Sequence, residues 1–220
     1  SHDELEDWMM RAAQGGLGSK IHCTGDGSVR HVLDIAEKLR AEGYTTPLHL
    51  AHAQFIAVDD IPRCARLNVV TEISPTLWFP GVIYEAIKLV IGEKRANQMQ
   101  PNRSVLDAGG TVIGGSDWPV IPLPNPWLGI EGLITRADPS GTFPGTLWKE
   151  QALTLDEAVA VYTTASSKAM GLWSETGSLE VGKSADFIVL DRNPWETPAT
   201  DLADTQVLET WFAGENVYIR

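Results

Sequence analysis

The stretch Leu48-His49-Leu50-Ala51-His52 is an apolar run that ends in a histidine, and two other runs also end in a residue able to bind a metal. The first is Ser19-Lys20-Ile21-His22, and the last is Thr111-Val112-Ile113-Gly114-Gly115-Ser116-Asp117. Parallel β/α barrels place their active-site residues at the carboxyl ends of successive strands. The three runs therefore predict part of such a barrel, with His22, His52 and Asp117 as candidate metal ligands.

Composition excludes several classes of function. The 220 residues are 43% hydrophobic and carry a formal net charge of −12, from 17 basic and 29 acidic side chains. This acidity repels phosphate backbones, so we expect no nucleic-acid partner. No apolar run reaches membrane-spanning length and the N-terminus is unlike a signal peptide, so we expect a cytoplasmic protein without a membrane partner. Cys23 and Cys64 lie outside any CxxC pattern, which argues against a disulfide scaffold or a cysteine zinc site.

Helices alternate with strands through the first part of the chain. Apolar residues at helical spacing, together with Gly and Pro breaks, predict four helices and a shorter one starting near residue 59. A capping box formed by Thr154 and Glu157 predicts a further helix that continues to about Met170. Only strands are predicted beyond residue 174, so the pattern favours an α/β architecture followed by a β tail. The four helices are predicted at 4–14, 28–42, 84–91 and 103–108, and the remaining strands at 68–74, 186–190, 207–212 and 217–219.

The histidines differ in how strongly they indicate a site. A lone His22 would most simply be a core histidine with a hydrogen bond, but it is followed by a second strand-end histidine. His49 and His52 are three residues apart on one strand and should point to opposite faces. The end position favours His52 as the ligand, and His49 is expected to pack or hydrogen-bond against the outer helices. His31 is expected on a helix surface.

Four other residues are candidates for supporting roles. The carboxylate of Asp117 could bind a metal and accept a proton, although Gly-Ser-Asp is also common in turns. Asp26 is either a turn or N-cap residue or a group that orients His22. Ser116 is expected to orient the neighbouring ligand. Trp118 could contact substrate, or it could simply pack within the Pro-rich loop that follows it.

The order IHCTGD, LAHAQF and GGSDWPV resembles the amidohydrolase superfamily, and more specifically the YtcJ-like metal-dependent hydrolases of amidohydrolase family 3. The segments TLDEAVAVYTTASSKAMGL and GSLEVGKSADFIVLD resemble that family's C-terminal signature. The resemblance implies a (β/α)8 barrel holding one or two divalent metals, usually zinc, and a small β-sandwich built from both chain ends. It places His22, His52 and Asp117 at the ligand positions of strands 5, 6 and 8. Asp117 would then be the general base that activates the metal-bound water.

The chain also departs from this pattern. The family's HxH pair on strand 1 and its strand 4 lysine are absent, and Ala51 stands where relatives often have glutamate. The resemblance therefore implies that residues 1–174 form barrel strands 5–8 and that residues 175–220 form a segment of the β-sandwich. The metal site would be incomplete, and the chain would self-associate or pair with a missing N-terminal half.

The function that this resemblance implies is hydrolysis of a C–N bond in a small amide-type substrate. We expect the chain to be a C-terminal fragment that is inactive alone. Two alternatives remain from the sequence. One is a different hydrolytic reaction, on esters or cyclic amides or in deamination. The other is a half-barrel that serves as a non-catalytic assembly module or remnant.

Overall fold

The computed structural model describes residues 2–77, 79–121 and 123–220, and the chain divides into two compact units. Unit 1 comprises Ser1–Ile73 and Ile87–Ile113, and unit 2 comprises Ser74–Ala86 and Gly114–Arg220. The helix α4 (Val82–Ile91) has residues in both units. The predicted boundary between residues 174 and 175 stays a prediction.

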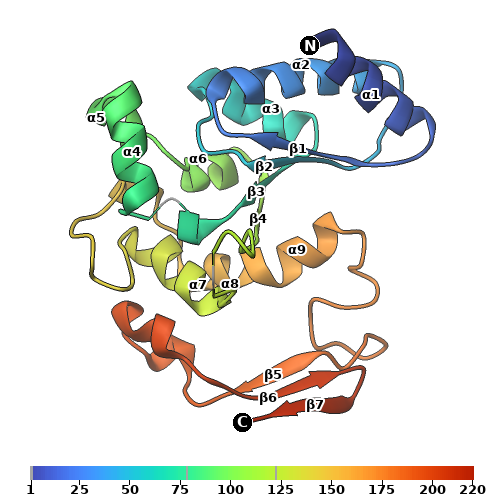
Figure 1. Cartoon of the computed structure of the whole chain (residues 1–220). Helices are drawn as coiled ribbons and strands as arrows, with labels where there is room; N and C mark the ends of the chain where they lie inside the picture. The colour runs from blue at the N-terminus through green and yellow to red at the C-terminus, as the bar shows by residue number, and fades with distance from the viewer. Residues whose placement is uncertain (1, 78, 122) are drawn as a thin grey trace. The chain divides into compact units, whose positions relative to one another are not determined.

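A four-stranded sheet organises unit 1 (Figure 1). Its order is β1-β2-β3-β4, so strands consecutive in sequence are neighbours in the sheet. β1 pairs with β2 in parallel, with His22 opposite Ala51, and β2 pairs in parallel with β3. The expected α/β fold with a parallel sheet is therefore confirmed. The strands are β1 (Ser19–Cys23), β2 (Leu48–His52), β3 (Val69–Ile73) and β4 (Thr111–Gly114).

The helices α1 (His2–Gln14), α2 (Asp26–Ala41) and α3 (Ile61–Arg66) cover one face of this sheet. α2 buries the apolar stripe that predicted it, and the stripe joins Cys23, Leu48, Leu50 and Val69 in one core. Each fully buried aliphatic side chain contributes about 1.5–3 kcal/mol to folding. In Figure 1, α1, α2 and α3 lie on the same side of the strands. The other helices of this unit are η1 (Val58–Asp60), α5 (Glu93–Ala96) and α6 (Asn102–Asp107).

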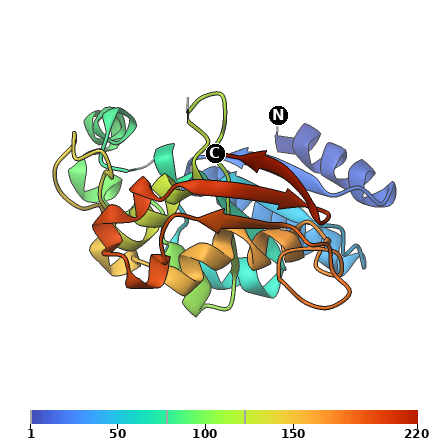
Figure 2. The ribbon, with the colours of Figure 1, turned by 90° about the horizontal axis from the view of Figure 1, so that it is seen from below.

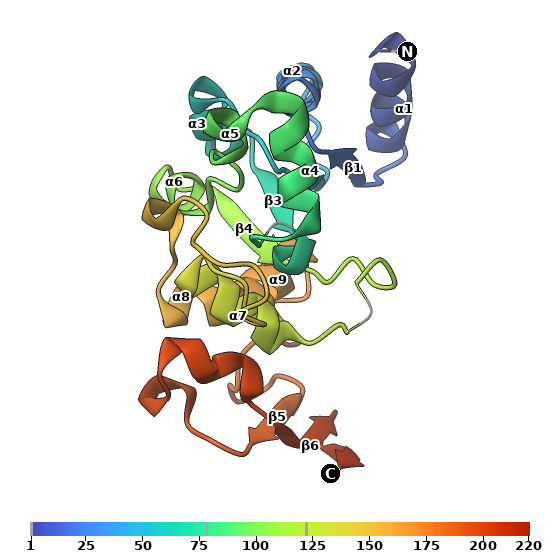
Figure 3. The same cartoon turned by 60° about the vertical axis from the view of Figure 1, so that its left-hand side comes forward.

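Unit 2 contains packed helices and a three-stranded antiparallel sheet. α7 (Pro126–Thr135) and α8 (Leu155–Tyr162) pack side by side, as Figure 3 shows. The strands β5, β6 and β7 pair in that order and lie side by side in Figure 2, in orange to red. Their bounds are β5 (Phe187–Leu190), β6 (Val207–Phe212) and β7 (Glu215–Ile219); the remaining elements are η2 (Pro75–Leu77), η3 (Lys149–Gln151), α9 (Thr164–Ala169), η4 (Pro194–Glu196) and η5 (Ala199–Asp204).

The predicted helix from Thr154 to Met170 is in fact two helices. The capping box is present, because Glu157 N–H donates to the Thr154 hydroxyl and the Glu157 carboxylate accepts the Thr154 N–H. Thr163, with φ −125° and ψ −94°, then separates α8 from α9. Its hydroxyl donates to Val159 O at 2.8 Å. Threonine hydroxyls compete for helix carbonyls in this way, which explains the break that the apolar pattern did not show.

Among the described residues, none of the helices has the length and apolar character needed to cross a bilayer.

Candidate metal-binding site

His22 and His52 lie at the carboxyl ends of the neighbouring parallel strands β1 and β2. Their ring centroids are 4.8 Å apart, and the rings meet edge to face at 82°. Parallel pairing explains this proximity, because it brings the carboxyl ends of adjacent strands to the same edge of the sheet. Two imidazoles offer the nitrogen donors that zinc and similar metals prefer. The predicted pairing of these two histidines is thus present within unit 1.

The backbone at the end of β2 turns sharply at His52. Strict alternation would place His52 on the helix-covered face with Leu48 and Leu50. His52 and the next residue, Ala53, instead have φ values of 70° and 44°. Left-handed backbone costs non-glycine residues about 1–2 kcal/mol each, so neighbouring contacts must hold it in place. This turn allows His52 to reach His22 although the strand pattern alone would separate them.

Gln100 supplies such a contact, and sequence reasoning did not single it out. Its Nε2 donates to the His52 carbonyl oxygen at 2.8 Å, and its own N–H donates to Gln54 O at 2.8 Å. Gln100 is fully buried. It lies 48 residues from His52 in the sequence, and no local pattern links the two positions.

His49 lies on the opposite face from the one predicted. Its Nδ1 is 3.9 Å from a Glu72 carboxylate oxygen, and the other oxygen accepts from Lys20 Nζ at 2.5 Å. Lys20 is opposite His49 in the strand register, so these side chains share the sheet face away from the apolar core. The prediction that His49 packs against the outer helices is therefore wrong. That prediction assumed that side chains alternate between the two sheet faces all the way to His52. The left-handed turn at His52 interrupts this alternation.

The pKa of Glu72 reflects its surroundings. Burial raises this pKa, but the contacts with His49 and Lys20 outweigh burial, so the net shift is downward. The charged Glu72 carboxylate on β3 contacts side chains from the strands β1 and β2. Glu72, Lys20 and His49 thus form a polar cluster on β1, β2 and β3, on the same sheet face as His22.

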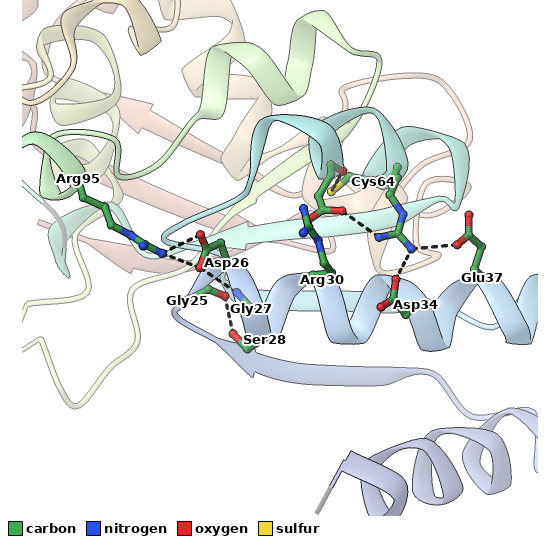
Figure 4. Close-up of polar contacts among 11 residues, drawn as sticks. Gly25, Asp26, Gly27, Ser28, Arg30, Asp34, Glu37, Cys64 and Arg95 are labelled. Atoms are coloured by element: carbon green, nitrogen blue, oxygen red, sulfur yellow. Dashed lines mark hydrogen bonds and ion pairs between the residues drawn. The ribbon is translucent and has the colours of Figure 1, made fainter. Parts of the chain in front are cut away.

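Asp26 contacts an arginine in the structure. Both carboxylate oxygens accept from Arg95 Nη2, at 2.8 and 2.7 Å, and Oδ1 also accepts the N–H of Gly27 (Figure 4). Gly25 holds the N-cap position of α2, so Asp26 is the first helical residue and the N-cap alternative is wrong. A role for Asp26 in orienting His22 stays a prediction.

In unit 2, Asp117 follows β4 in a tight turn. Asp117 has φ 55°, and its carbonyl oxygen accepts the N–H of Val120 at 2.9 Å. The Ser116 hydroxyl accepts the N–H of Trp118 at 3.2 Å, which bridges the turn across Asp117. Trp118 is 64% exposed. The expected roles of Asp117, Ser116 and Trp118 stay predictions.

The donor set bears on which metal could be bound. Within the described ranges, no group of three or more His, Cys, Asp or Glu side chains is arranged to hold a metal ion. Burial raises the pKa of Cys23 and of Cys64 to about 11, so neither is a thiolate at neutral pH. The two imidazoles of His22 and His52 therefore fit two positions of a nitrogen-and-oxygen site.

Comparison with known proteins identifies the family. Residues 1–218 match a family described as the Amidohydrolase family. The chain belongs to this family. The predicted resemblance to YtcJ-like amidohydrolases is thereby confirmed.

Two curated relatives align along essentially the whole chain. N-substituted formamide deformylase of Arthrobacter pascens is 32% identical over 225 residues, covering 100% of this chain and 40% of the relative. YtcJ of Bacillus subtilis (strain 168), which is named as an amidohydrolase, is 26% identical over 222 residues, covering 99% of this chain and 41% of the relative. The chain thus spans about two fifths of the length of these relatives.

Solved structures of hydrolases superpose on this chain. An uncharacterized metal-dependent hydrolase from Pyrococcus horikoshii OT3 superposes with a TM-score of 0.73 at 25% identity, covering 90% of this chain and 39% of that one. An amidohydrolase from Thermotoga maritima MSB8 superposes with a TM-score of 0.67 at 17% identity, covering 96% of this chain and 46% of that one. At that identity the second match shows the fold alone.

Proposed function

We propose that the chain is the C-terminal part of a metal-dependent amidohydrolase that hydrolyses a C–N bond in a small amide-type substrate. The observation that carries the proposal is the His22–His52 pair, with ring centroids 4.8 Å apart at the carboxyl ends of adjacent parallel strands. Membership of the amidohydrolase family supports the reaction class. The N-substituted formamide deformylase relative suggests the kind of substrate.

The proposal extends to the architecture of the complete enzyme. β1 to β4 would be barrel strands 5 to 8, within a barrel domain that includes residues 1–174. Residues 175–220 would complete a small β-sandwich. Support comes from the sheet order, in which β1 is a terminal strand with one neighbour among the described strands. An N-terminal half or a second copy of the chain would pair there, and the enzyme would act in the cytoplasm.

The proposed roles follow from the chemistry of the side chains. His22 and His52 would hold a divalent metal, most simply zinc, with Asp117 as a further ligand. When bound, the metal would supply Lewis-acid chemistry and lower the pKa of water. Asp117 would accept the proton of the attacking water and pass it to the leaving amine nitrogen. Asp26 and Ser116 would orient these groups, and Trp118 would contact substrate.

Metal titration of the purified chain tests this proposal. Zinc affinity, measured by isothermal titration calorimetry, should fall at least about tenfold in His22→Ala and in His52→Ala, because each variant removes one donor. Asp117→Asn should weaken it as well. His49→Gln is the matched control from the same strand, and it should bind zinc like the unmodified chain. Equal affinity in all four variants would place the bound zinc elsewhere and refute the assigned ligands.

A turnover assay tests separately whether the chain is inactive by itself. The 220-residue chain should hydrolyse N-benzylformamide poorly or not at all when zinc is added, because the proposed N-terminal ligands are missing. Rapid zinc-dependent turnover by this chain alone would contradict that part of the proposal and leave the ligand assignment intact.

A further inference from the structure

A cavity of about 220 Å³ in unit 2 adjoins the turn that carries Asp117. Gly114, Gly115 and Ser116 line one side of it, directly before Asp117 in the chain. Its polar lining residues also include Thr76, Asn125 and Tyr162. Thr76, Asn125 and Tyr162 have no role in the proposed hydrolysis. The cavity has room for a group of several non-hydrogen atoms, since a water molecule occupies about 30 Å³ in the liquid.

Two glycines leave the space that the Tyr162 side chain occupies in this wall. A Cβ at Gly114 would lie 2.8 Å from the ring atoms Cε1 and Cζ of Tyr162. A Cβ at Gly129, on α7, would lie 2.0 Å from the Tyr162 hydroxyl oxygen. Both distances are too short for any larger residue without movement of the ring. The absence of side chains at these two positions therefore permits the observed place of the phenol.

The Tyr162 hydroxyl is available for a ligand. It has no hydrogen-bond partner among the residues that the structure describes. Burial raises the pKa of this phenol well above its usual range, so it stays protonated and can donate a hydrogen bond at neutral pH.

Thr76 contributes a second hydroxyl of the same kind. Its Oγ1 is buried without a hydrogen-bond partner in the described parts of the chain. A buried hydroxyl in that state costs about 1–3 kcal/mol, and a ligand that bonds to it recovers this cost. The side-chain oxygens of Ser116 and Asn125 already accept the N–H groups of Trp118 and Trp127.

The lining also indicates which charge the ligand should have. Leu123, Pro124 and Pro126 complete the wall, and none of the described lining residues is charged. A carboxylate or an ammonium group would lose part of its hydration here without gaining a counter-ion. A neutral amide or carbonyl group loses far less on desolvation, and its oxygen can accept from a hydroxyl.

We infer that this cavity is a subsite for an uncharged amide or carbonyl portion of the substrate, with the Tyr162 hydroxyl as the donor to its oxygen. Thr76 provides the second polar contact. This inference rests on the proposed function, because it names the part of an amide-type substrate that would bind beside Asp117. Tyr162 is then a substrate-binding residue, and the uncharged lining of the cavity selects neutral groups over charged ones.

Benzamide and benzoate form a probe pair of nearly equal size that differ in charge at pH 7.5. The chain is labelled with 3-fluorotyrosine, and the Tyr162 ¹⁹F resonance is assigned from its loss in Tyr162→Phe. Benzamide should shift this resonance, with benzoate binding at least about tenfold more weakly. The dissociation constant for benzamide, from ligand-observed NMR, should rise about fivefold in Tyr162→Phe, because one hydrogen bond is lost.

Tyr218→Phe is the matched control, since it removes an exposed hydroxyl from β7. It should leave benzamide binding unchanged. Thr76→Val is a second, nearly isosteric variant, and it should weaken binding even if Tyr162→Phe fails to fold. The inference is overturned if benzamide does not bind, if benzoate binds as tightly, or if binding is unchanged in both cavity variants. These measurements need neither metal nor turnover, so they can fail or succeed independently of the zinc and hydrolysis tests.

Discussion

The two sheets of this chain are built from similar residues, but they are covered very differently. In the parallel sheet, Leu48, Leu50 and Val69 are buried in the core formed with α2. In the antiparallel sheet, β7 is exposed at every position, and Ile219 is 72% exposed. Strand composition therefore predicts where a strand forms, but it does not predict whether other elements bury that strand. Stability should depend on buried area in the first sheet and on cross-strand pairs in the second.

The largest effect is expected from a truncation in the parallel sheet. Leu50 is fully buried, so Leu50→Ala should lower the free energy of unfolding by about 3 kcal/mol, through lost burial and the cavity it leaves. Val189 on β5 is 37% exposed, and Val189→Ala should cost less than about 1 kcal/mol. Urea denaturation followed by circular dichroism measures both. Equal losses in the two variants would show that the antiparallel sheet is covered as well as the parallel one.

An intermediate effect is expected from the polar cluster beneath the histidine pair. Glu72→Gln removes the charge that holds Lys20 and His49, and should cost about 1–2 kcal/mol at pH 7. Because folding lowers the pKa of Glu72, its stabilisation is complete above the unfolded pKa of about 4.3 and is lost as the pH falls through the lower folded pKa. The variant should therefore lose less stability than the unmodified chain on acidification below about pH 4.3. Thermal unfolding between pH 3 and pH 7 measures the difference.

Glu180 in unit 2 is the matched control for this pH dependence. It pairs with Lys183 at 3.4 Å, and its pKa is also lowered, by hydrogen bonds from Ser178 and Lys183 and by the lysine charge. Its carboxylate is exposed to solvent, which screens such pairs. Glu180→Gln should change the pH profile less than Glu72→Gln. An equal or larger change would contradict the role assigned to the cluster on β1, β2 and β3.

The smallest effect is expected from the aromatic pair of the antiparallel sheet. Trp211 stacks on Phe187 with ring centroids 5.5 Å apart and planes inclined by 10°. Trp211→Leu should cost about 1 kcal/mol, which is the typical value of an aromatic pair beyond its buried area. Phe212 is 65% exposed, so Phe212→Leu serves as the control and should change stability less. Hydrogen exchange of β5 and β6 should quicken only in the Trp211 variant.

Local sequence patterns predicted most of the fold. The apolar stripe of α2, the capping box at Thr154 and the alternation of helices with short strands all appear in the structure. These features depend on residues close together in the chain. The proximity of His22 and His52 was also predictable, because parallel strands that are adjacent in a sheet bring their carboxyl ends together.

Two of the errors concern features that depend on distant residues. The face of His49 was predicted wrongly because the left-handed turn at His52 is held by Gln100, 48 residues away. No pattern in the sequence predicted the cavity beside Asp117 either. Tyr162 occupies an ordinary helical position in the pattern, and its place is revealed only by the approach of Gly114 and Gly129 from other elements.

The contact between Gly129 and Tyr162 also has an evolutionary consequence. Since a Cβ at position 129 would lie 2.0 Å from the phenol oxygen, an alanine there requires either movement of the Tyr162 ring or a smaller residue at position 162. The two positions should therefore change together as the family diverges, with glycine accompanying tyrosine and larger residues accompanying smaller partners. A lineage that needs a subsite without a hydroxyl donor could reach it through either position, but each step would constrain the other.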